Sequence, residues 1–282
     1  MPELPEVETV RLGLESRTQG MTIAKVAVLR QRAIASPQEP ALFELALGGC
    51  RIEGWQRRGK YLMAKLSHGD GSEAGHWGVH LRMTGQFLWI QEPTTVCPHT
   101  RVRFWNPAGD ELRFIDTRSF GQMWWVPPHT APETVITGLG RLGPEPFDPQ
   151  TTAEYLSRRL QGSKRPIKNA LLDQSLIAGV GNIYADESLF AAGIRPDTPS
   201  GALSLDRLAQ LQRCLVEVLR ASIGAGGTTF SDFRDLKGLN GHYGSQAWVY
   251  RRSGQACRRC GNPIQRQRLG GRSSHWCSQC QT

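Results

Sequence analysis

The sequence predicts an α+β protein: an N-terminal β-sandwich domain with an N-terminal helix, then a helical C-terminal domain that ends in a four-cysteine zinc ribbon. Three observations predict this fold class. Short apolar or alternating runs fill residues 22–126, helical periodicity follows a proline-rich stretch, and two Cys-x₂-Cys pairs lie near the end of the chain. With 282 residues, the chain is long enough for two domains with cores of their own.

The first residues contain a candidate nucleophile. Removal of Met1 would leave Pro2 with a free secondary amine, close to the carboxyl groups of Glu3 and Glu6. Because an α-amino group titrates at about pH 7.7–8.0, part of it is neutral and nucleophilic at physiological pH. With an aldehyde carbon, such an amine forms an iminium, which acts as a cationic electron sink. The segment therefore predicts covalent chemistry on a carbonyl carbon.

The same segment is also predicted to form a helix. Pro5 suits the first turn, where its missing N–H is not needed, and acidic residues favour the positive end of the helix dipole. Val7, Val10 and Leu14 fall at helical spacing, so one face would pack on a core. Taken alone, a helix start explains the segment without any chemistry.

The elements that follow are predicted from periodicity. Strands are expected at Ile23–Leu29, Tyr61–Leu66, Val79–Ile90, Arg101–Trp105 and Leu112–Trp125, and helices at Thr151–Leu160, Ile167–Leu172, Asn182–Ala192 and from Leu205 to Ile223. Prolines between Pro127 and Pro149 indicate an interdomain connection. We expect a sandwich domain at 1–135, a helical domain at 136–225, a connecting segment at 226–247 and the zinc ribbon at 248–282.

Charge and composition favour a nucleic-acid partner. The net charge is +9, and the 47 residues from Leu236 onward hold one lysine, seven arginines and no Asp or Glu. A basic surface of this kind is typical of proteins that bind a polyanion. The chain has no apolar run of membrane-spanning length and no signal-like N-terminus, so we expect a cytoplasmic, nucleoid-associated protein with no membrane partner.

The cysteine spacing predicts one structural Zn²⁺ ion. Cys257-x₂-Cys260 and Cys277-x₂-Cys280 are separated by sixteen residues, which lets two tight turns supply four thiolates to a tetrahedral ion. Four protein ligands leave no open position for water, so this zinc would stabilise the fold and take no part in chemistry. Between the pairs, Arg272 follows two glycines at the expected tip of a hairpin. It is a candidate phosphate contact or an ordinary solvated arginine.

Several motifs together resemble the bacterial formamidopyrimidine-DNA glycosylase family over almost the whole chain. They are, in order, Met1-Pro2-Glu3-Leu4-Pro5-Glu6-Val7-Glu8-Thr9-Val10, Arg58-Gly59-Lys60-Tyr61-Leu62, His80-Leu81-Arg82-Met83-Thr84-Gly85, Asp116-Thr117-Arg118-Ser119-Phe120-Gly121, Gly179-Val180-Gly181-Asn182-Ile183-Tyr184 and the cysteine quartet. The resemblance implies that the helical domain at 136–225 binds DNA through a helix–two-turn–helix element, and that residues 226–247 form a lesion-recognition loop. It also implies a monomer that acts on double-stranded DNA containing oxidised bases or abasic sites.

The activity implied by the resemblance is excision of 8-oxoguanine and formamidopyrimidines, followed by β- and δ-elimination at the abasic site. The damaged nucleotide must first leave the stack, which costs a few kcal/mol. The catalytic residues implied are Pro2 as nucleophile, Glu3 as acid, Glu6 as a second carboxylate, and Lys60 and Arg272 as proton donors or phosphate clamps. The DNA contacts implied are His80, Met83, His99, Arg118, Phe120, Lys164, Lys168 and Asn182, of which Met83, Arg118 and Phe120 would fill the vacated space.

Two departures from the family pattern and two alternatives accompany this interpretation. Ser119 stands where relatives often carry a second basic residue, and Gly69–Gly75 is an added glycine-rich loop. The nearest alternative is the sister glycosylase for oxidised pyrimidines, against which Leu4 and the segment Gly226–Gly244 argue. An alternative from another class is a non-catalytic zinc-ribbon DNA-binding protein.

Overall fold

Residues 1–228, 236 and 238–282 are described by the computed structural model, and they divide into two units. Unit 1 contains Met1–Gly140 and Gly226–His242, and unit 2 contains Arg141–Ala225 and Tyr243–Thr282. Residues 229–235 and 237 of the predicted lesion-recognition loop lie outside the described residues. The domain boundaries given above divide the chain more finely and stay predictions.

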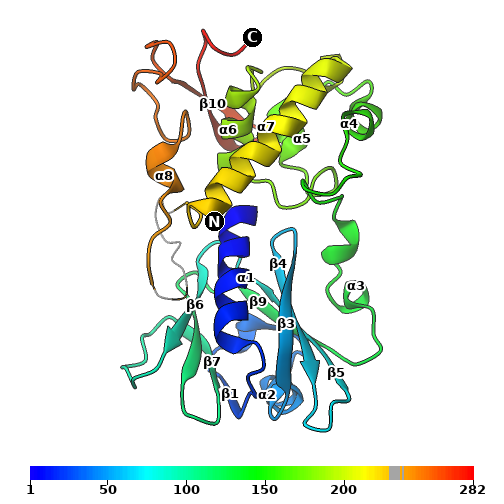
Figure 1. The fold of residues 1–282 in the computed structure, drawn as a ribbon, viewed down its shortest axis with the longest axis vertical. Coiled ribbons are helices and arrows are strands. Elements are labelled where there is room, and N and C mark those ends of the chain that lie inside the picture. Colours follow the sequence, from blue (N-terminus) through cyan, green and yellow to red (C-terminus); the bar gives the residue numbers. More distant parts are fainter. Residues whose placement is uncertain (229–235, 237) are drawn as a thin grey trace. The chain divides into compact units, whose positions relative to one another are not determined.

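Unit 1 begins with the helix expected from the apolar spacing. Helix α1 (Leu4–Thr18) starts after Glu3, its N-cap, and buries Val7, Val10 and Leu14. Figure 1 shows α1 lying along strand β3, and Trp55 of that strand fixes the helix end: its ring nitrogen donates to the Thr18 hydroxyl over 2.8 Å. The predicted helix, with Val7, Val10 and Leu14 packed on the core, is therefore confirmed.

Two sheets form the sandwich of unit 1. The strands are β1 (Lys25–Val28), β2 (Ile34–Ser36), β3 (Arg51–Arg58), β4 (Tyr61–Ser67), β5 (Glu73–His80), β6 (Gly85–Ile90), β7 (Thr100–Trp105), β8 (Glu111–Asp116) and β9 (Gln122–Val126). One sheet has the order β1-β7-β8-β6 and the other β2-β9-β5-β4-β3. All neighbours pair antiparallel except β2 and β9. Short connections between successive strands favour this antiparallel arrangement.

Aromatic side chains from both sheets meet in the core. Trp77 of β5 packs against Phe104 of β7 and Phe87 of β6, with ring centroids 4.3 and 6.0 Å apart. Phe87 in turn contacts Phe114 of β8 at 5.1 Å, and all four side chains are fully buried. Contacts between inward-facing residues of two sheets are what define a sandwich, so this part of the predicted fold class is confirmed.

The sequence interpretation of unit 1 was incomplete in several places. The runs Val79–Ile90 and Leu112–Trp125 each break into two strands, because residues 81–84 and 117–121 form loops in which Arg82 and Ser119 adopt positive φ. Strands β2 and β3 and residues 73–78 of β5 were not predicted; β2 is a short edge strand, and β3 is an edge strand rich in charged residues. The short helices α2 (Pro40–Leu47) and α3 (Pro132–Val135) and the turns η1 (Gln31–Ala33) and η2 (Leu139–Arg141) were also missed.

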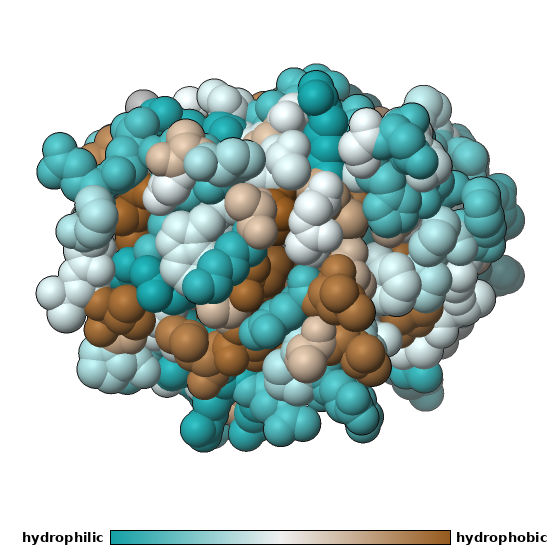
Figure 2. Space-filling model, turned by 90° about the horizontal axis from the view of Figure 1, so that it is seen from below, coloured by the Kyte–Doolittle hydropathy of each residue, from teal (hydrophilic) through white to brown (hydrophobic). Residues whose placement is uncertain are grey.

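Helix α2 presents apolar side chains on two sides. Phe43 and Leu47 are fully buried, whereas Leu42 and Leu45 are exposed. Figure 2 shows apolar side chains among hydrophilic ones on the face of the molecule seen from below. The exposed leucines explain why periodicity alone did not identify an inward face for this helix.

Unit 2 is helical, as predicted. Its helices are α4 (Ala153–Leu160), α5 (Ile167–Leu171), α6 (Asn182–Ala191), α7 (Leu205–Gly224) and α8 (Tyr243–Gln246), with the turn η3 (Ser200–Ala202). Figure 1 shows α6 and α7 side by side. Helix α7 buries Leu208, Leu211, Leu215 and Leu219 as expected. Leu205, assigned to the same face, is exposed because it lies in the first turn, beyond the packed part of the helix.

The end of unit 2 forms the expected hairpin. Strands β10 (Gln265–Leu269) and β11 (Arg272–Trp276) pair antiparallel, with Leu269 opposite Arg272. Gly270 and Gly271 form the two-residue turn with φ of 51° and 78°. Left-handed φ at both central positions is what a tight hairpin turn requires, which explains the two glycines.

Candidate functional site

The start of α1 in unit 1 is held by buried carboxylates. Glu3 and Glu6 are 3% and 1% exposed, and Pro2 is buried beside them. One carboxylate oxygen of Glu6 accepts from the Glu3 N–H over 2.8 Å, and the other accepts from the Thr228 N–H over 2.8 Å. Glu6 therefore holds both the first turn of α1 and the backbone of Thr228. A favourable position at the helix dipole does not by itself account for these contacts.

Lys60 lies at the turn between β3 and β4, and a network of charged side chains ties that turn to α1. Gly59 has a φ of 56°, and its carbonyl accepts from Arg57 over 3.0 Å. The same guanidinium donates to Glu8 of α1 over 2.9 Å. Lys60 itself is only 8% exposed. The predicted nucleophile and the predicted lysine thus belong to elements that are joined directly within one unit.

Asp116 joins the two loops that carry the predicted space-filling residues. Its carboxylate is fully buried and accepts from the Thr84 hydroxyl, from the Arg118 N–H over 3.1 Å and from the Gly121 N–H over 2.6 Å. Thr84 belongs to the β5–β6 loop with Met83, and Arg118 and Gly121 belong to the β8–β9 loop. One buried carboxylate therefore orders both loops. A charged group without a partner would not be stable in this position.

The tips of these loops present the side chains expected to enter DNA. Arg118 is exposed, Phe120 is 39% exposed and Met83 is half-buried. The Phe120 ring is close to two cations, with the guanidinium carbons of Arg118 and Arg32 at 4.9 and 5.5 Å from its centroid. An aromatic ring in contact with arginines suits binding to both bases and phosphates. Arg32 was not singled out from the sequence, where it had no motif around it.

The two histidines among the predicted DNA contacts differ in environment. His99 is exposed and lies beside Arg101, whereas His80 is 8% exposed. Burial, together with the positive charges of Arg82 and Lys60, lowers the pKa of His80 to about 3. Its Nδ1 accepts from the Arg82 N–H over 2.9 Å, so the proton of the neutral ring is on Nε2. His80 is therefore a neutral hydrogen-bond donor and not a cation.

In unit 2, the predicted DNA contacts occupy three kinds of position. Asn182 is the first residue of α6, as expected, and the turn before it is held by Gln174, whose side chain bonds Gly179 and Val180. Lys164 is exposed. Arg272 is exposed at the first position of β11, directly after the hairpin turn. Backbone N–H groups at the start of a helix favour phosphate binding, and exposed basic side chains extend such a surface.

Lys168 differs from the other predicted contacts, because its side chain has no exposed surface. Its ammonium group is 2.6 Å from Asp186 and donates to the Ser273 carbonyl over 2.6 Å. Contact with a phosphate would require this ion pair to open. Asp186 and the adjacent Glu187 were missed in the sequence, where two acidic residues in a helix predict an exposed position. The only signal was that they are surrounded by apolar residues.

The four predicted ligand cysteines are brought together. The Sγ atoms of Cys257, Cys260, Cys277 and Cys280 all lie within 4.8 Å of one another. The Cys257–Cys280 and Cys260–Cys277 pairs are separated by 3.9 and 3.4 Å. Sulfur atoms at 2.3 Å from a tetrahedral zinc are about 3.8 Å apart, so the cluster fits one Zn²⁺ ion.

Local hydrogen bonds prepare this cluster for a cation. Burial raises the pKa of the Cys257 thiol, but hydrogen bonds from the backbone N–H groups of Arg259 and Cys260 and from the Cys277 and Cys260 thiols outweigh it and bring the value to about 7. The Gln281 side chain accepts from the Cys277 N–H and donates to the Ile194 carbonyl, which fixes the second pair to the helical part of unit 2. Burial and the neighbouring thiols raise the pKa of Cys277 and Cys280, so it is the preformed geometry of the four sulfur atoms that supports a structural zinc site.

Among the described residues, no helix has the length and apolar composition needed to cross a membrane. Three family models match the chain. They are described as the formamidopyrimidine-DNA glycosylase N-terminal domain over residues 1–123, the H2TH domain of the same family over 142–234, and a zinc finger found in FPG and IleRS over 254–282.

Similar proteins cover the chain from end to end. Formamidopyrimidine-DNA glycosylases of Prochlorococcus marinus (strain MIT 9313) and Parasynechococcus marenigrum (strain WH8102) are both 64% identical, over 100% of this chain and of theirs. A solved Lactococcus lactis Fpg in complex with abasic-site DNA superposes with a TM-score of 0.88 at 31% identity, over 99% of each chain. The MutM (Fpg) protein of Thermus thermophilus gives 0.85 at 38% identity, over 99% of this chain and 98% of that one. The chain therefore belongs to the formamidopyrimidine-DNA glycosylase family.

Proposed function

We propose that this protein is a bifunctional DNA repair enzyme that excises oxidised purines from duplex DNA and then cleaves the abasic strand. The observation that carries the proposal is the 64% identity over the full chain to proteins named formamidopyrimidine-DNA glycosylases. The arrangement in unit 1 supports it, since the carboxylates of Glu3 and Glu6, close to Pro2 in the chain, are buried, and two ordered loops present Met83, Arg118 and Phe120.

The reaction begins with the amine that removal of Met1 would expose on Pro2. Its lone pair attacks C1′ of the flipped nucleotide, the bond from C1′ to the base breaks, and the proton that the amine nitrogen loses passes to the departing base. Glu3 supplies a proton as the sugar ring opens, and an iminium then joins Pro2 to C1′. Glu6 holds the Glu3 backbone in place during these steps. A buried carboxyl group beside the reacting carbon suits this acid role.

The elimination steps follow from the iminium. It acidifies C2′, whose proton is lost as the 3′ phosphate leaves; loss of a second sugar proton then expels the 5′ phosphate. Hydrolysis of the iminium returns the free amine. We assign Lys60 to β-elimination and Arg272 to δ-elimination, as proton donors or phosphate clamps. The result is a gap of one nucleotide.

The remaining predicted residues bind DNA in this proposal. Met83, Arg118 and Phe120 fill the space that the flipped nucleotide leaves, since the unstacked duplex must be supported. His80 donates through Nε2, and phosphates are bound by His99, Lys164, Lys168 and Asn182. Lys168 would have to leave Asp186 to do so, and an indirect role for it is argued below.

We further propose that the protein acts as a monomer on chromosomal DNA in the cytoplasm. The basic C-terminal segment supports DNA as the partner. Light scattering can test this by measuring the molar mass of the free protein and of its complex with a lesion duplex. A monomer predicts the mass of one chain for the free protein and of one chain per duplex for the complex.

Borohydride trapping tests the enzyme against the alternative of a non-catalytic DNA-binding protein. With an abasic or 8-oxoguanine duplex, reduction should give a covalent adduct that maps to Pro2 by mass spectrometry. Pro2→Gly and a form that retains Met1 should give much less. Absence of an adduct from folded, zinc-loaded protein that binds the same duplex would favour the non-catalytic alternative.

A lesion comparison separates the purine enzyme from its sister class. The Lactococcus lactis protein has been crystallised with DNA containing Fapy-dG and with DNA containing an oxidised pyrimidine, so a second substrate class has direct precedent in a relative. We expect 8-oxoguanine opposite cytosine to be excised faster than 5-hydroxyuracil or thymine glycol. The opposite order would assign the protein to oxidised pyrimidines.

A further inference from the structure

We infer that Asp186 is a positioning residue that holds the β10–β11 hairpin of unit 2, and with it Arg272, in the orientation used for δ-elimination. The inference rests on the role proposed above for Arg272. Asp186 lies on α6, 86 positions before Arg272 in the chain, and nothing in its sequence surroundings points to the hairpin. The structure brings the two elements together.

The carboxylate of Asp186 is only 1% exposed and receives four donors. One oxygen lies 2.6 Å from the Lys168 ammonium group and accepts from the Ser274 hydroxyl over 3.2 Å. The other lies 2.9 Å from the His275 N–H and 3.0 Å from its Nδ1. A buried charge with this set of partners is satisfied only while the hairpin is in place. Asp186 therefore fixes the position of two successive residues of β11.

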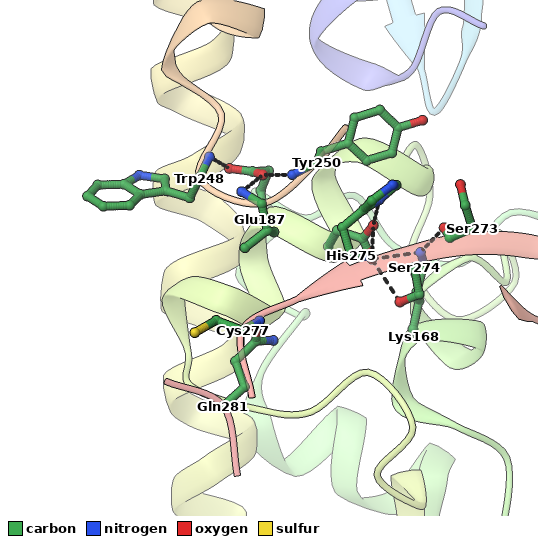
Figure 3. Close-up of polar contacts among 11 residues, drawn as sticks. Lys168, Glu187, Trp248, Tyr250, Ser273, Ser274, His275, Cys277 and Gln281 are labelled. Carbon is green, nitrogen blue, oxygen red and sulfur yellow. Dashed lines mark hydrogen bonds and ion pairs between the residues drawn. The ribbon is translucent and has the colours of Figure 1, made fainter. Parts of the chain in front are cut away.

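Lys168 extends the same network to a third residue of the strand. Its ammonium group donates to the Ser273 carbonyl, so residues 273–275 are all held from α5 and α6 (Figure 3). These residues follow Arg272 directly. The hairpin turn is fitted to α5 as well, since a Cβ on Gly270 would overlap the Asn169 side chain. The hairpin is thus held before Arg272, at Gly270, and after it, at residues 273–275.

His275 gives the network a second attachment. Its ring packs edge-on against Tyr250, with centroids 5.0 Å apart and planes at 70°. The neighbouring carboxylate, Glu187, has a different role, because it accepts from the backbone N–H groups of Trp248, Val249 and Tyr250. Figure 3 shows Glu187 facing the segment from Trp248 to Tyr250, away from Ser273. Two adjacent acidic residues thus hold different parts of the C-terminal segment.

This arrangement matters for chemistry because Arg272 has a long, exposed side chain and directly follows the two-residue turn. A guanidinium group contributes to a reaction only when its backbone is fixed, and a displacement of about 1 Å can reduce a rate a hundredfold. Loss of the Asp186 network should therefore reduce the step that uses Arg272. It should leave base excision and β-elimination, which we assign to groups of unit 1, nearly unchanged.

The test measures the products formed from an abasic duplex, resolved as β-elimination and β,δ-elimination ends. Asp186→Asn is the main variant, and His275→Phe is a milder one that keeps the ring on Tyr250 but removes the Nδ1 bond. Arg272→Ala is the reference. Glu187→Gln is the matched control, because it alters an equally buried carboxylate whose hydrogen bonds go to the segment from Trp248 to Tyr250 and not to the hairpin itself. Zinc content and thermal unfolding are measured for each variant, and borohydride adducts for the wild type.

We expect Asp186→Asn to lower the ratio of δ to β product by about tenfold or more, and His275→Phe by about threefold, with β product within twofold of wild type. In the Arg272→Ala background, Asp186→Asn should lower the ratio no further, since both changes remove one function. Glu187→Gln should keep the wild-type ratio. If Asp186→Asn does not fold, His275→Phe decides the question by the same criteria.

Several results would overturn the inference. These are a wild-type product ratio in both hairpin variants, an equal loss of both products, an additive loss in the Arg272→Ala background, or the same change of ratio in Glu187→Gln. Failure of the proposed function is seen separately, because the wild type would then give neither an adduct nor cleavage, and the inference would fail with it.

Discussion

Replacement of Asp116 by Asn should loosen both DNA-facing loops of unit 1. The carboxylate accepts from Thr84 and Arg118 on one oxygen and from Gly121 on the other. Asn has one acceptor oxygen, so either the Gly121 N–H or the Thr84 and Arg118 pair must face an NH₂ group. A hydrogen bond to a charged group contributes about 1.5–3 kcal/mol, so we expect a destabilisation of roughly 2–3 kcal/mol.

This loss has two measurable consequences. At about 2–4 °C per kcal/mol for a domain of this size, the Tm should fall by roughly 4–12 °C. If about 1.4 kcal/mol of the loss must be recovered when the loops order on DNA, the Kd for a duplex with a stable abasic analogue should rise about tenfold. Calorimetry and fluorescence anisotropy measure the two quantities.

Glu111→Gln is the matched control for this prediction. Glu111 lies at the other end of β8, is 4% exposed and pairs with Arg103 and Arg113, away from both loops. It should lower the Tm by a similar amount and leave the Kd within about twofold. A wild-type Kd and Tm in Asp116→Asn, or an equal rise of the Kd in Glu111→Gln, would refute the reasoning.

Three further predictions concern metal, pH and backbone. Removal of zinc by a chelator, or the substitution Cys257→Ser, should unfold the hairpin and weaken DNA binding. Unit 1 should keep its near-ultraviolet circular dichroism. Unchanged DNA binding by the metal-free protein would contradict this prediction. Burial would raise the pKa of Glu111, but the hydrogen bonds and charges of Arg103 and Arg113 outweigh burial and lower this pKa to about 2. The ionised Glu111 carboxylate therefore stabilises the fold fully above about pH 4.5, and this contribution is lost as pH falls toward 2. The stability of Glu111→Gln, measured by unfolding at each pH, should depend less on pH in this range. Gly270→Ala, at a φ of 51° and against Asn169, should lower the Tm of zinc-loaded protein by several degrees, and an unchanged Tm would argue against close packing of the turn.

Local patterns in the sequence determined much of the fold. The spacing of Val7, Val10 and Leu14 was sufficient for α1, because an amphipathic helix needs only an apolar face and a start signal. The spacing of the cysteines was sufficient for the metal centre, because two tight turns close on one ion wherever the hairpin lies. Breaks in the strand runs and the polar edge strand β3 were missed, since periodicity does not show where a loop or a sheet edge falls.

The tertiary structure alone decided which charged residues are buried and what each holds. Asp186 contacts His275 across 89 positions of the chain, and Lys168 reaches Ser273 across 105, so no local pattern could pair them. By composition, Lys168 belongs to the basic surface expected to bind DNA, yet its side chain is fully buried. The physical reason is that periodicity and spacing depend on neighbours in sequence, whereas the burial of a charge depends on the partners that the folded chain brings to it.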